Sequence, residues 1–409
     1  MPIRPVININ APNHQRRKRL CKTQQKGVII LIKKTKGINK VENFRPISLL
    51  NYDYKILARI LTNRQKPLME KLLHPSQCCG VPTRNIFDAT CSLRDCVAYL
   101  QNHNIDGLLV SLDFERAFDN IRHDFLFECL KQYGFSNTVI SYFKCIYHNI
   151  TATIQVNGFL TAPINITKSI RQGCPASMVL FTLPINPLIW KLHNRITGIQ
   201  NQGLKLSVPV MAYADDVTVI LSNKNDEIKL KDALQEFQNF SGLEVNKRKS
   251  KSIPIGGWNR QNNNVEIEMT TQHKILGIQY SNSIAEMKNL NWTEIIRNIK
   301  ILTKELYHRE LCIYRRSWII HTYILSKCWY VAQILPLEKN EARQITCAVS
   351  WFLWRGCIFR IPLSTLYQKP IAGGIGLINV EDKSLALFLN RGIQYINQNR
   401  KTFTEMWYK

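Results

Sequence analysis

The feature that most constrains this chain is a set of carboxylates at the ends of otherwise apolar strands. Residues 108–112 form an apolar run that ends in Asp113, and residues 208–221 predict a hairpin with Asp215 and Asp216 near its tip. Short apolar runs bounded by turn residues are typical of buried strands. If the run and the hairpin are neighbours in one sheet, the three carboxylates come together at one end of it.

Three carboxylates at this position are enough to hold two divalent cations. Mg²⁺ prefers hard oxygen ligands, usually one or two carboxylates together with phosphate oxygens. Two such ions about 3.5–4 Å apart lower the pKa of an attacking hydroxyl and neutralise a leaving pyrophosphate. The alternative is a solvated turn for the Asp215-Asp216 pair, and a cap or loop position for Asp113.

The remaining pattern predicts an α+β chain. A short apolar run at 27–32 and an alternating stretch ending at Val156 predict strands, and Asn157-Gly158 is a strong hairpin turn. Helical periodicity appears at 51–73, 85–101, 122–133, 226–240 and after Ser136. The face expected to be buried in the 51–73 helix consists of Ile56, Leu57, Ile60 and Leu61.

From about residue 290 the sequence predicts mostly helix. This part is rich in tryptophan, at Trp292, Trp318, Trp329, Trp351 and Trp354. Such a stripe is usually helical core, and stacking on nucleic-acid bases is the alternative function.

Composition narrows the class of partner. The chain has 55 Lys and Arg against 29 Asp and Glu, a net charge of +26, so its surface attracts polyanions, among which nucleic acid comes first. A ribosomal or membrane-surface protein would share this charge.

The 12 cysteines form no CxxC pair, which favours reduced thiols in the cytoplasm or nucleus. The N-terminus does not resemble a signal peptide, and no apolar run is long enough for a bilayer.

Eight segments in a fixed order give the chain a resemblance to a known family. Residues 112–119 (LDFERAFD), 171–175 (RQGCP) and 212–217 (AYADDV) closely resemble motifs A, B and C of reverse transcriptases. Five more resemble segments of the non-LTR, LINE-type retrotransposon enzymes. They are two fingers motifs at 43–57 and 77–88, motif D at 242–250, the primer grip at 274–278, and a segment beyond the thumb at 351–377. The resemblance covers about residues 27–380.

The resemblance implies an RNA-directed DNA polymerase with a right-hand polymerase fold, made of fingers, an antiparallel-sheet palm and a helical thumb. Asp113, Asp215 and Asp216 would bind two Mg²⁺ ions, with Mn²⁺ as an alternative. The backbone carbonyl of Phe114 would be a further ligand. Phe118 matches the aromatic steric gate that excludes a 2′-hydroxyl; its alternative is a core position.

Four more residues acquire expected roles from the same resemblance. Gln172 and Gly173 would lie beside the incoming nucleotide and the templating base, and Gly173 has no Cβ to block a close approach. Arg45 would clamp the triphosphate, since its guanidinium fork suits phosphate oxygens. Lys249 matches a motif D lysine that protonates pyrophosphate. The neighbouring cations Lys247, Arg248 and Lys251 remain alternatives for this last role.

The implied partners are an RNA template, a DNA primer and dNTPs, with no membrane; the oligomeric state stays open. The expected division is a disordered basic tail at 1–26, fingers at 27–105, a palm at 106–262, and the primer grip, thumb and C-terminal extension at 263–409. The sequence has no room for the upstream endonuclease that such elements encode, so we expect a truncated copy.

One departure and two other functions complete the expectations. Pro184 and Pro187 lie inside the predicted motif B helix, and an internal proline removes a hydrogen bond and kinks the axis.

The first alternative function is a catalytically silent remnant that only binds nucleic acid. The second is a different palm polymerase, such as a group II intron maturase, a telomerase or a viral RNA polymerase.

Overall fold

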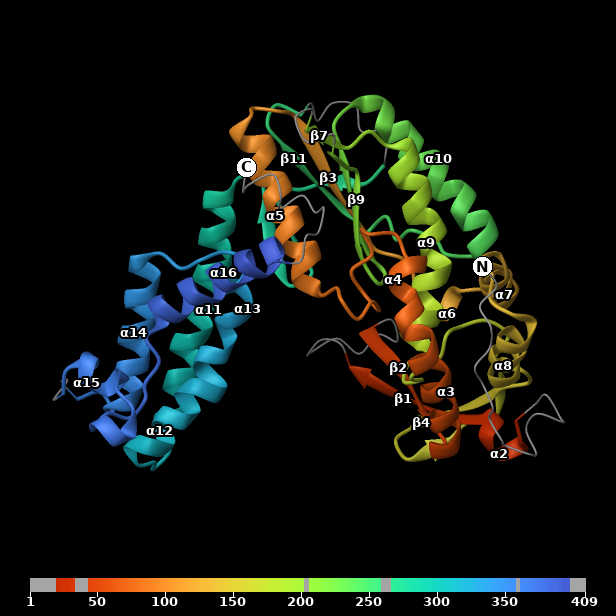
Figure 1. The fold of residues 1–409 in the computed structure, drawn as a ribbon. Helices are drawn as coiled ribbons and strands as arrows, with labels where there is room; N and C mark the ends of the chain where they lie inside the picture. The colour runs from red at the N-terminus through yellow and green to blue at the C-terminus, as the bar shows by residue number, and fades with distance from the viewer. Residues whose placement is uncertain (1–19, 34–42, 202–205, 259–265, 358–360, 398–409) are drawn as a thin grey trace.

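The computed structural model describes residues 20–33, 43–201, 206–258, 266–357 and 361–397 (Figure 1). A central sheet connects two arms that extend in the same direction. One arm contains the N-terminal sheet with its helices, and the other is a bundle formed by the C-terminal helices. None of the helices in the described ranges is long and apolar enough to cross a bilayer.

The central sheet has the strand order β12-β11-β3-β10-β9. Its strands are β3 (Gly107–Leu112), β9 (Val210–Tyr213), β10 (Asp216–Leu221), β11 (Lys251–Ile255) and β12 (Glu268–Met269). Strand β3 is antiparallel to β10 and to β11, and β10 is antiparallel to β9. The carboxylate-ended strand and the hairpin are therefore neighbours, as expected.

Alternation along the strands gives this sheet two apolar faces. Leu108 and Val110 belong to one core, which the helices α7, α8, α9 and α10 complete. Leu109 and Ile220 belong to a second core, shared with α5 and the C-terminal helices. Their bounds are α5 (Ile86–Asn102), α7 (His123–Gln132), α8 (Asn137–Tyr147), α9 (Ser177–Arg195) and α10 (Lys224–Ser241). Because both faces are covered, the strands read as nearly continuous apolar runs.

The second large sheet has the order β2-β1-β4-β5, with β6 also paired to β4. Its strands are β1 (Lys26–Lys33), β2 (Phe44–Leu50), β4 (Thr151–Val156), β5 (Phe159–Leu160) and β6 (Ile164–Asn165). Strand β1 is parallel to β4, so a segment expected in the palm joins the sheet expected in the fingers. The boundary at residue 105 therefore does not follow the sheets. Two short hairpins complete the strands, β7 (Ile199–Asn201) with β8 (Leu206–Val208) and β13 (Gln272–Ile275) with β14 (Ile278–Ser281).

The remaining helices lie before β3, directly after it, or in the C-terminal bundle. Before β3 they are α2 (Lys22–Gln25), α3 (Tyr52–Gln65), the 3₁₀ turn η2 (Lys66–Leu68) and α4 (Met69–Leu72), and the short α6 (Ala117–Asn120) follows β3. The C-terminal bundle contains α11 (Ile284–Leu306), α12 (Ile313–Ile319), the π-helical η3 (Ile320–Ile324), η4 (Leu325–Lys327), α13 (Trp329–Ala332), α14 (Lys339–Leu353), α15 (Leu363–Tyr367), η5 (Pro370–Ala372) and α16 (Val380–Asn397).

Two expectations near the N-terminus hold only in part. The 1–26 segment is not irregular throughout, because Leu20 is buried and α2 precedes β1; residues 1–19 lie outside the described residues. In the 51–73 segment Leu61 is buried as expected and Leu57 packs against the core, but Ile56 is 49 % exposed, and Tyr54 and Ala58 are buried instead. Two residues along a helix turn the side chain by about 200°, so the expected isoleucine face points to solvent.

The two prolines do not break α9, which runs as one helix from Ser177 to Arg195. Pro187 cannot donate to the carbonyl of Leu183, four residues earlier. The hydroxyl of Tyr133 donates to that carbonyl instead (3.3 Å), and the side-chain amide of Asn186 donates to the same hydroxyl (2.7 Å). A side chain thus satisfies the group that the proline leaves free.

The tryptophans divide between core and surface. Trp292 is buried in the C-terminal core, as expected, but Trp318 is 67 % exposed. The aromatic stripe is therefore only partly core.

Candidate active site

Asp113 directly follows β3, and Asp216 is the first residue of the antiparallel neighbour β10. The β3–β10 pairing runs to Leu112 and Val217, and continuing this register by one position sets Asp113 opposite Asp216. Directly opposed residues have Cβ atoms about 4.5–5.5 Å apart on one face of a sheet. Asp215 precedes Asp216 at the tip between β9 and β10. The topology thus gathers the three carboxylates at one end of the central sheet.

Hydrogen bonds from the segment before β11 fix the backbone of Asp113. Its N–H donates to Oγ of Ser250 (3.0 Å), which is fully buried, and its carbonyl accepts from the N–H of Asn246 (2.7 Å). The next residue, Phe114, is bridged to Val245. The local sequence did not indicate the role of Ser250, because its partner lies 137 positions away.

The same pairing sets the direction of the Phe114 carbonyl. The ladder bonds flank Phe114 on either side, from Glu115 N–H to Glu244 (2.8 Å) and from Asn246 N–H to Asp113. In an antiparallel pair of this type, the intervening residue directs its own N–H and C=O away from the partner strand. The Phe114 carbonyl therefore faces the β10 side, where Asp215 and Asp216 lie.

The carboxylates disturb each other electrostatically. Burial raises the pKa of Asp216 to about 6, and the negative charges of Asp215 and Asp113 add to the rise. Asp216 is an exposed residue, but the protein around its carboxyl group displaces part of the water that would otherwise stabilise the charged form. Burial and the charge of Asp113 also raise the pKa of Asp215, whereas the charge of Arg45 lowers it. A cation bound near these side chains would reduce the electrostatic repulsion among the carboxylates of Asp113, Asp215 and Asp216.

Arg45 is the cation of the N-terminal sheet that acts on this cluster. It is an exposed residue of β2, paired with Ile32 of β1, and its charge lowers the pKa of Asp215. The side chain is therefore close enough to Asp215 to influence it electrostatically. This position suits a group that would contact a polyanion held above the carboxylates.

Lys249 is the lysine directed at the cluster. Its Nζ lies 3.9 Å from Oδ2 of Asp113. The neighbouring Lys247 pairs with Glu266 (2.5 Å) and Lys251 pairs with Glu268. Of the three lysines, Lys249 alone forms its ion pair with Asp113.

Gln172 and Gly173 lie in the turn before α9, packed on β2. The N–H of Ser48 donates to the carbonyl of Gln172 (2.7 Å). Gly173 has φ +109°, and a Cβ placed on it would be 2.7 Å from the carbonyl oxygen of Ser48. Only glycine fits both the conformation and the contact. The missing side chain of Gly173 thus allows its backbone to pack against β2, the strand that carries Arg45.

Phe118 lies on the short helix α6, just beyond Asp113. Its ring stacks on that of Phe181 from α9, with centroids 4.3 Å apart and planes at 23°. Its carbonyl accepts from Ile170 N–H (2.6 Å), and the side chain is half-buried. The ring is therefore held from one side by the motif B helix, which is compatible with both the gate and the core hypotheses.

The donor chemistry at this end of the sheet fits a divalent cation. It provides hard carboxylate oxygens and an outward carbonyl, and its carboxylates repel one another, all of which favours Mg²⁺ or Mn²⁺. The side chains of the described residues nevertheless include no group of three or more His, Cys, Asp or Glu already converged on a metal position. The cluster has the composition of a metal site without its final side-chain arrangement.

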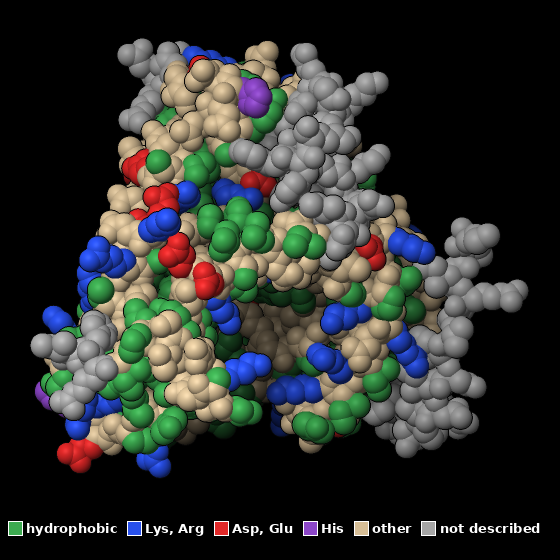
Figure 2. All heavy atoms as spheres, turned by 60° about the vertical axis from the view of Figure 1, so that its left-hand side comes forward, with side chains coloured by type: hydrophobic (Ala, Val, Ile, Leu, Met, Phe, Trp, Pro, Cys, Tyr) green, Lys and Arg blue, Asp and Glu red, His purple; other side chains and the backbone are tan. Residues whose placement is uncertain are grey.

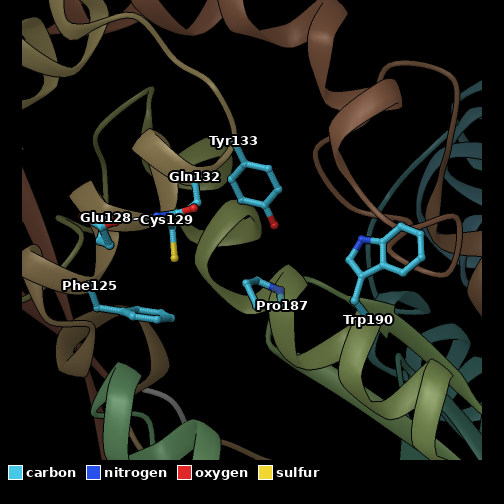
Figure 3. Close-up of a pocket in the computed structure, with 7 residues that line it drawn as sticks. All are labelled: Phe125, Glu128, Cys129, Gln132, Tyr133, Pro187 and Trp190. Atoms are coloured by element: carbon cyan, nitrogen blue, oxygen red, sulfur yellow. Dashed lines mark hydrogen bonds between the residues drawn. The ribbon is translucent and has the colours of Figure 1, made fainter.

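A separate pocket of about 430 Å³ lies between α7 and α9 (Figure 3). Its lining is mostly apolar and includes none of the expected site residues; it consists of Phe125, Glu128, Cys129, Gln132, Tyr133, Pro187 and Trp190. By contrast, the face shown in Figure 2 is hollowed, and Lys and Arg side chains gather around the hollow. That face suits a polyanion.

Comparisons with known proteins agree with this geometry. Residues 32–280 match the family described as reverse transcriptase (RNA-dependent DNA polymerase). The transposon TX1 uncharacterized 149 kDa protein of Xenopus laevis is 28 % identical over 345 residues, which cover 81 % of this chain and 26 % of that protein. The Pol polyprotein from the type-1 retrotransposable element R2 of Popillia japonica is 28 % identical over 229 residues, covering 55 % and 31 %.

The chain thus spans about a quarter to a third of the length of these relatives. Among solved structures, apo telomerase from Candida tropicalis superposes with a TM-score of 0.48 at 13 % identity, over 91 % of this chain and 63 % of that one.

Proposed function

This chain belongs to the reverse transcriptase (RNA-dependent DNA polymerase) family, and from that premise we propose that its central sheet carries out RNA-templated addition of dNTPs to a primer 3′-OH. The chain is related to the Pol proteins of non-LTR retrotransposons. Its fold is the α+β right-hand polymerase fold, with the central sheet as the palm. We assign the β1–β2 sheet and α3 to the fingers, and α11 to α16 to the thumb and C-terminal extension.

The observation that carries the proposal is the opposition of Asp113 and Asp216 across the β3–β10 pair, with Asp215 beside them. We propose that these carboxylates, with the Phe114 carbonyl, hold two Mg²⁺ ions, or Mn²⁺ in their place. When bound, the ions would lower the pKa of the primer hydroxyl and offset charge on the phosphates. The raised pKa values of Asp215 and Asp216 support this role, because burial and the neighbouring carboxylates both disfavour the charged forms, and a bound cation would offset both effects.

The surrounding residues position substrate. Arg45 would contact the triphosphate from the fingers strand, and Gln172 and Gly173 would form the floor beneath the nucleotide. Phe118, held by Phe181, would occupy the space that a 2′-hydroxyl needs. Lys249 would donate a proton to the leaving pyrophosphate, since its ammonium is already directed at the carboxylates. Phosphoryl transfer requires mainly such positioning and charge neutralisation from a protein.

The basic surface supports a nucleic-acid substrate. A net charge of +26 and the Lys and Arg side chains around the hollow in Figure 2 suit the backbone of a template–primer duplex. An RNA–DNA hybrid would be bound through its backbone and shape. We therefore propose an RNA template and a DNA primer as the partners.

Primer extension on an RNA template tests the proposal. We expect the full chain to incorporate dNTPs with Mg²⁺ or Mn²⁺, and Asp215→Ala to abolish incorporation. Asp232→Ala, which removes an exposed carboxylate of α10, is the matched control and should retain activity. Loss of incorporation in the control as well would refute the assignment of the cluster.

The second candidate function is nucleic-acid binding without catalysis. It is favoured by the carboxylates not being converged on a metal position in the described residues. Filter binding measured beside primer extension distinguishes the two. Tight template–primer binding with no incorporation by the parent chain would establish the silent remnant.

A further inference from the structure

The loop between α4 and α5 pairs through an isolated bridge with the β9–β10 hairpin, called here the palm hairpin. Strand β9 is the last in the central sheet, and the loop pairs with it in parallel at Gln77 and Ala212. Ala212 N–H donates to the carbonyl of Ser76 (3.0 Å), and Cys78 N–H donates to the carbonyl of Ala212 (2.8 Å). The sheet edge beside the carboxylates is therefore covered by a segment more than 130 residues away in sequence.

The side chain of Gln77 extends this pairing beyond the end of the strand. Its Oε1 accepts from the N–H of Ala214 (3.0 Å) and of Cys79 (3.0 Å), and its Nε2 lies 3.4 Å from the carbonyl of Ala214. The residue is completely buried. One amide thus takes the place of a neighbouring strand for Ala214, whose position at the tip offers it no ladder partner.

Ala214 requires such support because of its conformation. Its φ is +56°, in the left-handed region, and it immediately precedes Asp215. A non-glycine residue in this region is strained by roughly 1–2 kcal/mol. At the first position of a two-residue hairpin tip, positive φ is normally provided by glycine. Here an alanine takes that conformation while both of its backbone polar groups are satisfied by Gln77.

Gln77 is itself held in place from behind. Nη1 of Arg84 donates to the carbonyls of Gln77 (2.8 Å) and His74 (2.7 Å). The buried Asn186 of α9 accepts from His74 N–H (2.8 Å). The amide that holds the turn is thus anchored both to its own loop and to the motif B helix.

We infer that Gln77 is a positioning residue for the polymerase reaction: its side-chain amide fixes the left-handed turn at Ala214 and thereby the direction of the Asp215 carboxylate. The inference rests on the proposed function for its effect on rate, but the hydrogen bonds themselves do not. Misplacing a catalytic group by about 1 Å can cost about 100-fold in rate. Gln77 touches neither substrate nor ion in this account.

The test compares Gln77→Met, which keeps the length of the side chain and removes its hydrogen bonds, with Gln101→Met. Gln101 is exposed on α5 and accepts one backbone N–H, that of Ile284 of α11, rather than one from the palm hairpin. We expect kcat for dNTP incorporation to fall about 100-fold in Gln77→Met, with little change in the KM for dNTP and a higher Mg²⁺ requirement. Gln101→Met should keep the parental values. Parental kcat in Gln77→Met would overturn the inference.

A second substitution separates turn support from general stability. Glycine adopts positive φ without strain, so adding Ala214→Gly to Gln77→Met should recover at least about 10-fold of the lost kcat. A loss due only to a destabilised loop would not recover, and that result also overturns the inference. If Gln77→Met does not fold, Gln77→Asn serves in its place. Its amide is withdrawn by one methylene, and the same partial loss and recovery are expected.

Hydrogen exchange provides a readout independent of activity. The Ala214 amide should be protected in the parent chain and exchange at least about 10-fold faster in Gln77→Met, because the acceptor is gone. An unprotected amide in the parent contradicts the role of Gln77. If the parent is protected but incorporates no dNTP, the proposed function fails while the structural role of Gln77 stands.

Discussion

Lys249 directs its ammonium at Asp113, with 3.9 Å between Nζ and Oδ2, while the lysines two positions before and after it pair with other acids. We therefore expect Lys249→Ala to lower kcat about 100-fold, the lower range for loss of a general acid. Lys247→Ala removes an equal charge that pairs with Glu266, and it should lower kcat less than about threefold. Single-turnover incorporation measures both. Equal losses in the two variants would assign the effect to charge alone.

The raised pKa of Asp216 predicts the pH dependence of activity. Metal binding requires the carboxylate, and in the metal-free chain Asp216 gains its proton as the pH falls through about 6. We expect the Mg²⁺ concentration for half-maximal incorporation to rise steeply below pH 6 and to level off above pH 7. A flat dependence between pH 5 and 8 would show that this carboxylate does not bind the ion.

The same shift has a consequence for stability. The folded-state pKa lies above the ordinary value of 3.8, so the group stabilises the fold fully below pH 3.8 and that contribution is lost as the pH rises through about 6. Above that pH, and without metal, the charged Asp216 is repelled by Asp113 and Asp215 in the folded protein. Asp216→Asn should therefore raise the melting temperature at pH 7.5 without metal, and Mg²⁺ should raise it in the parent only. A lower melting temperature for the variant would contradict the electrostatic account.

Gly173 packs on β2, and Gly134, which follows α7, is a matched control for that contact. Both have positive φ, but a Cβ on Gly173 would be 2.7 Å from a backbone oxygen, whereas on Gly134 it would meet nothing within 4 Å. Gly134→Ala should cost about 1 kcal/mol, the conformational strain alone. Gly173→Ala should cost more and lower incorporation. Chemical denaturation gives both free energies of unfolding, and equal costs would refute the packing argument.

Phe118 gives the test of sugar selection. If its ring occupies the place of a 2′-hydroxyl, Phe118→Val should increase ribonucleotide relative to deoxynucleotide incorporation by at least about 10-fold, the lower range for one steric contact. Phe240→Ala, an exposed phenylalanine of α10, is the control and should leave the ratio unchanged. An unchanged ratio of ribonucleotide to deoxynucleotide incorporation in Phe118→Val would show that the ring does not select the sugar and only packs against Phe181.

The sequence predicted the elements whose signals are local. The apolar run ending in Asp113, the Asn157-Gly158 turn and the Ser136 cap all appear as expected. The buried face of α3 was predicted only in part: Leu61 is buried, but Ile56 and Ile60 are exposed, because that helix carries apolar residues on two faces and periodicity does not say which one meets the core.

Contacts between residues far apart in the chain could not be predicted from the local sequence. The parallel pairing of β1 with β4 joins residues about 125 positions apart, and the contact of Gln77 with Ala214 spans 137. The glutamine was visible as part of a motif, but its function depends on a turn that lies elsewhere in the chain. The proposal of Lys249 over Lys247 and Lys251 likewise rests on the positions of Glu266 and Glu268.

Anomalous diffraction from a crystal of this chain with Mn²⁺, template–primer and a non-reactive dNTP analogue tests the central claim most directly. The account predicts two manganese peaks about 3.5–4 Å apart, bound by carboxylate oxygens of Asp113 and of the Asp215-Asp216 pair. Carboxylate oxygens that stay more than about 8–10 Å apart, too far for ions at that spacing to bridge, with no manganese between them, would contradict it.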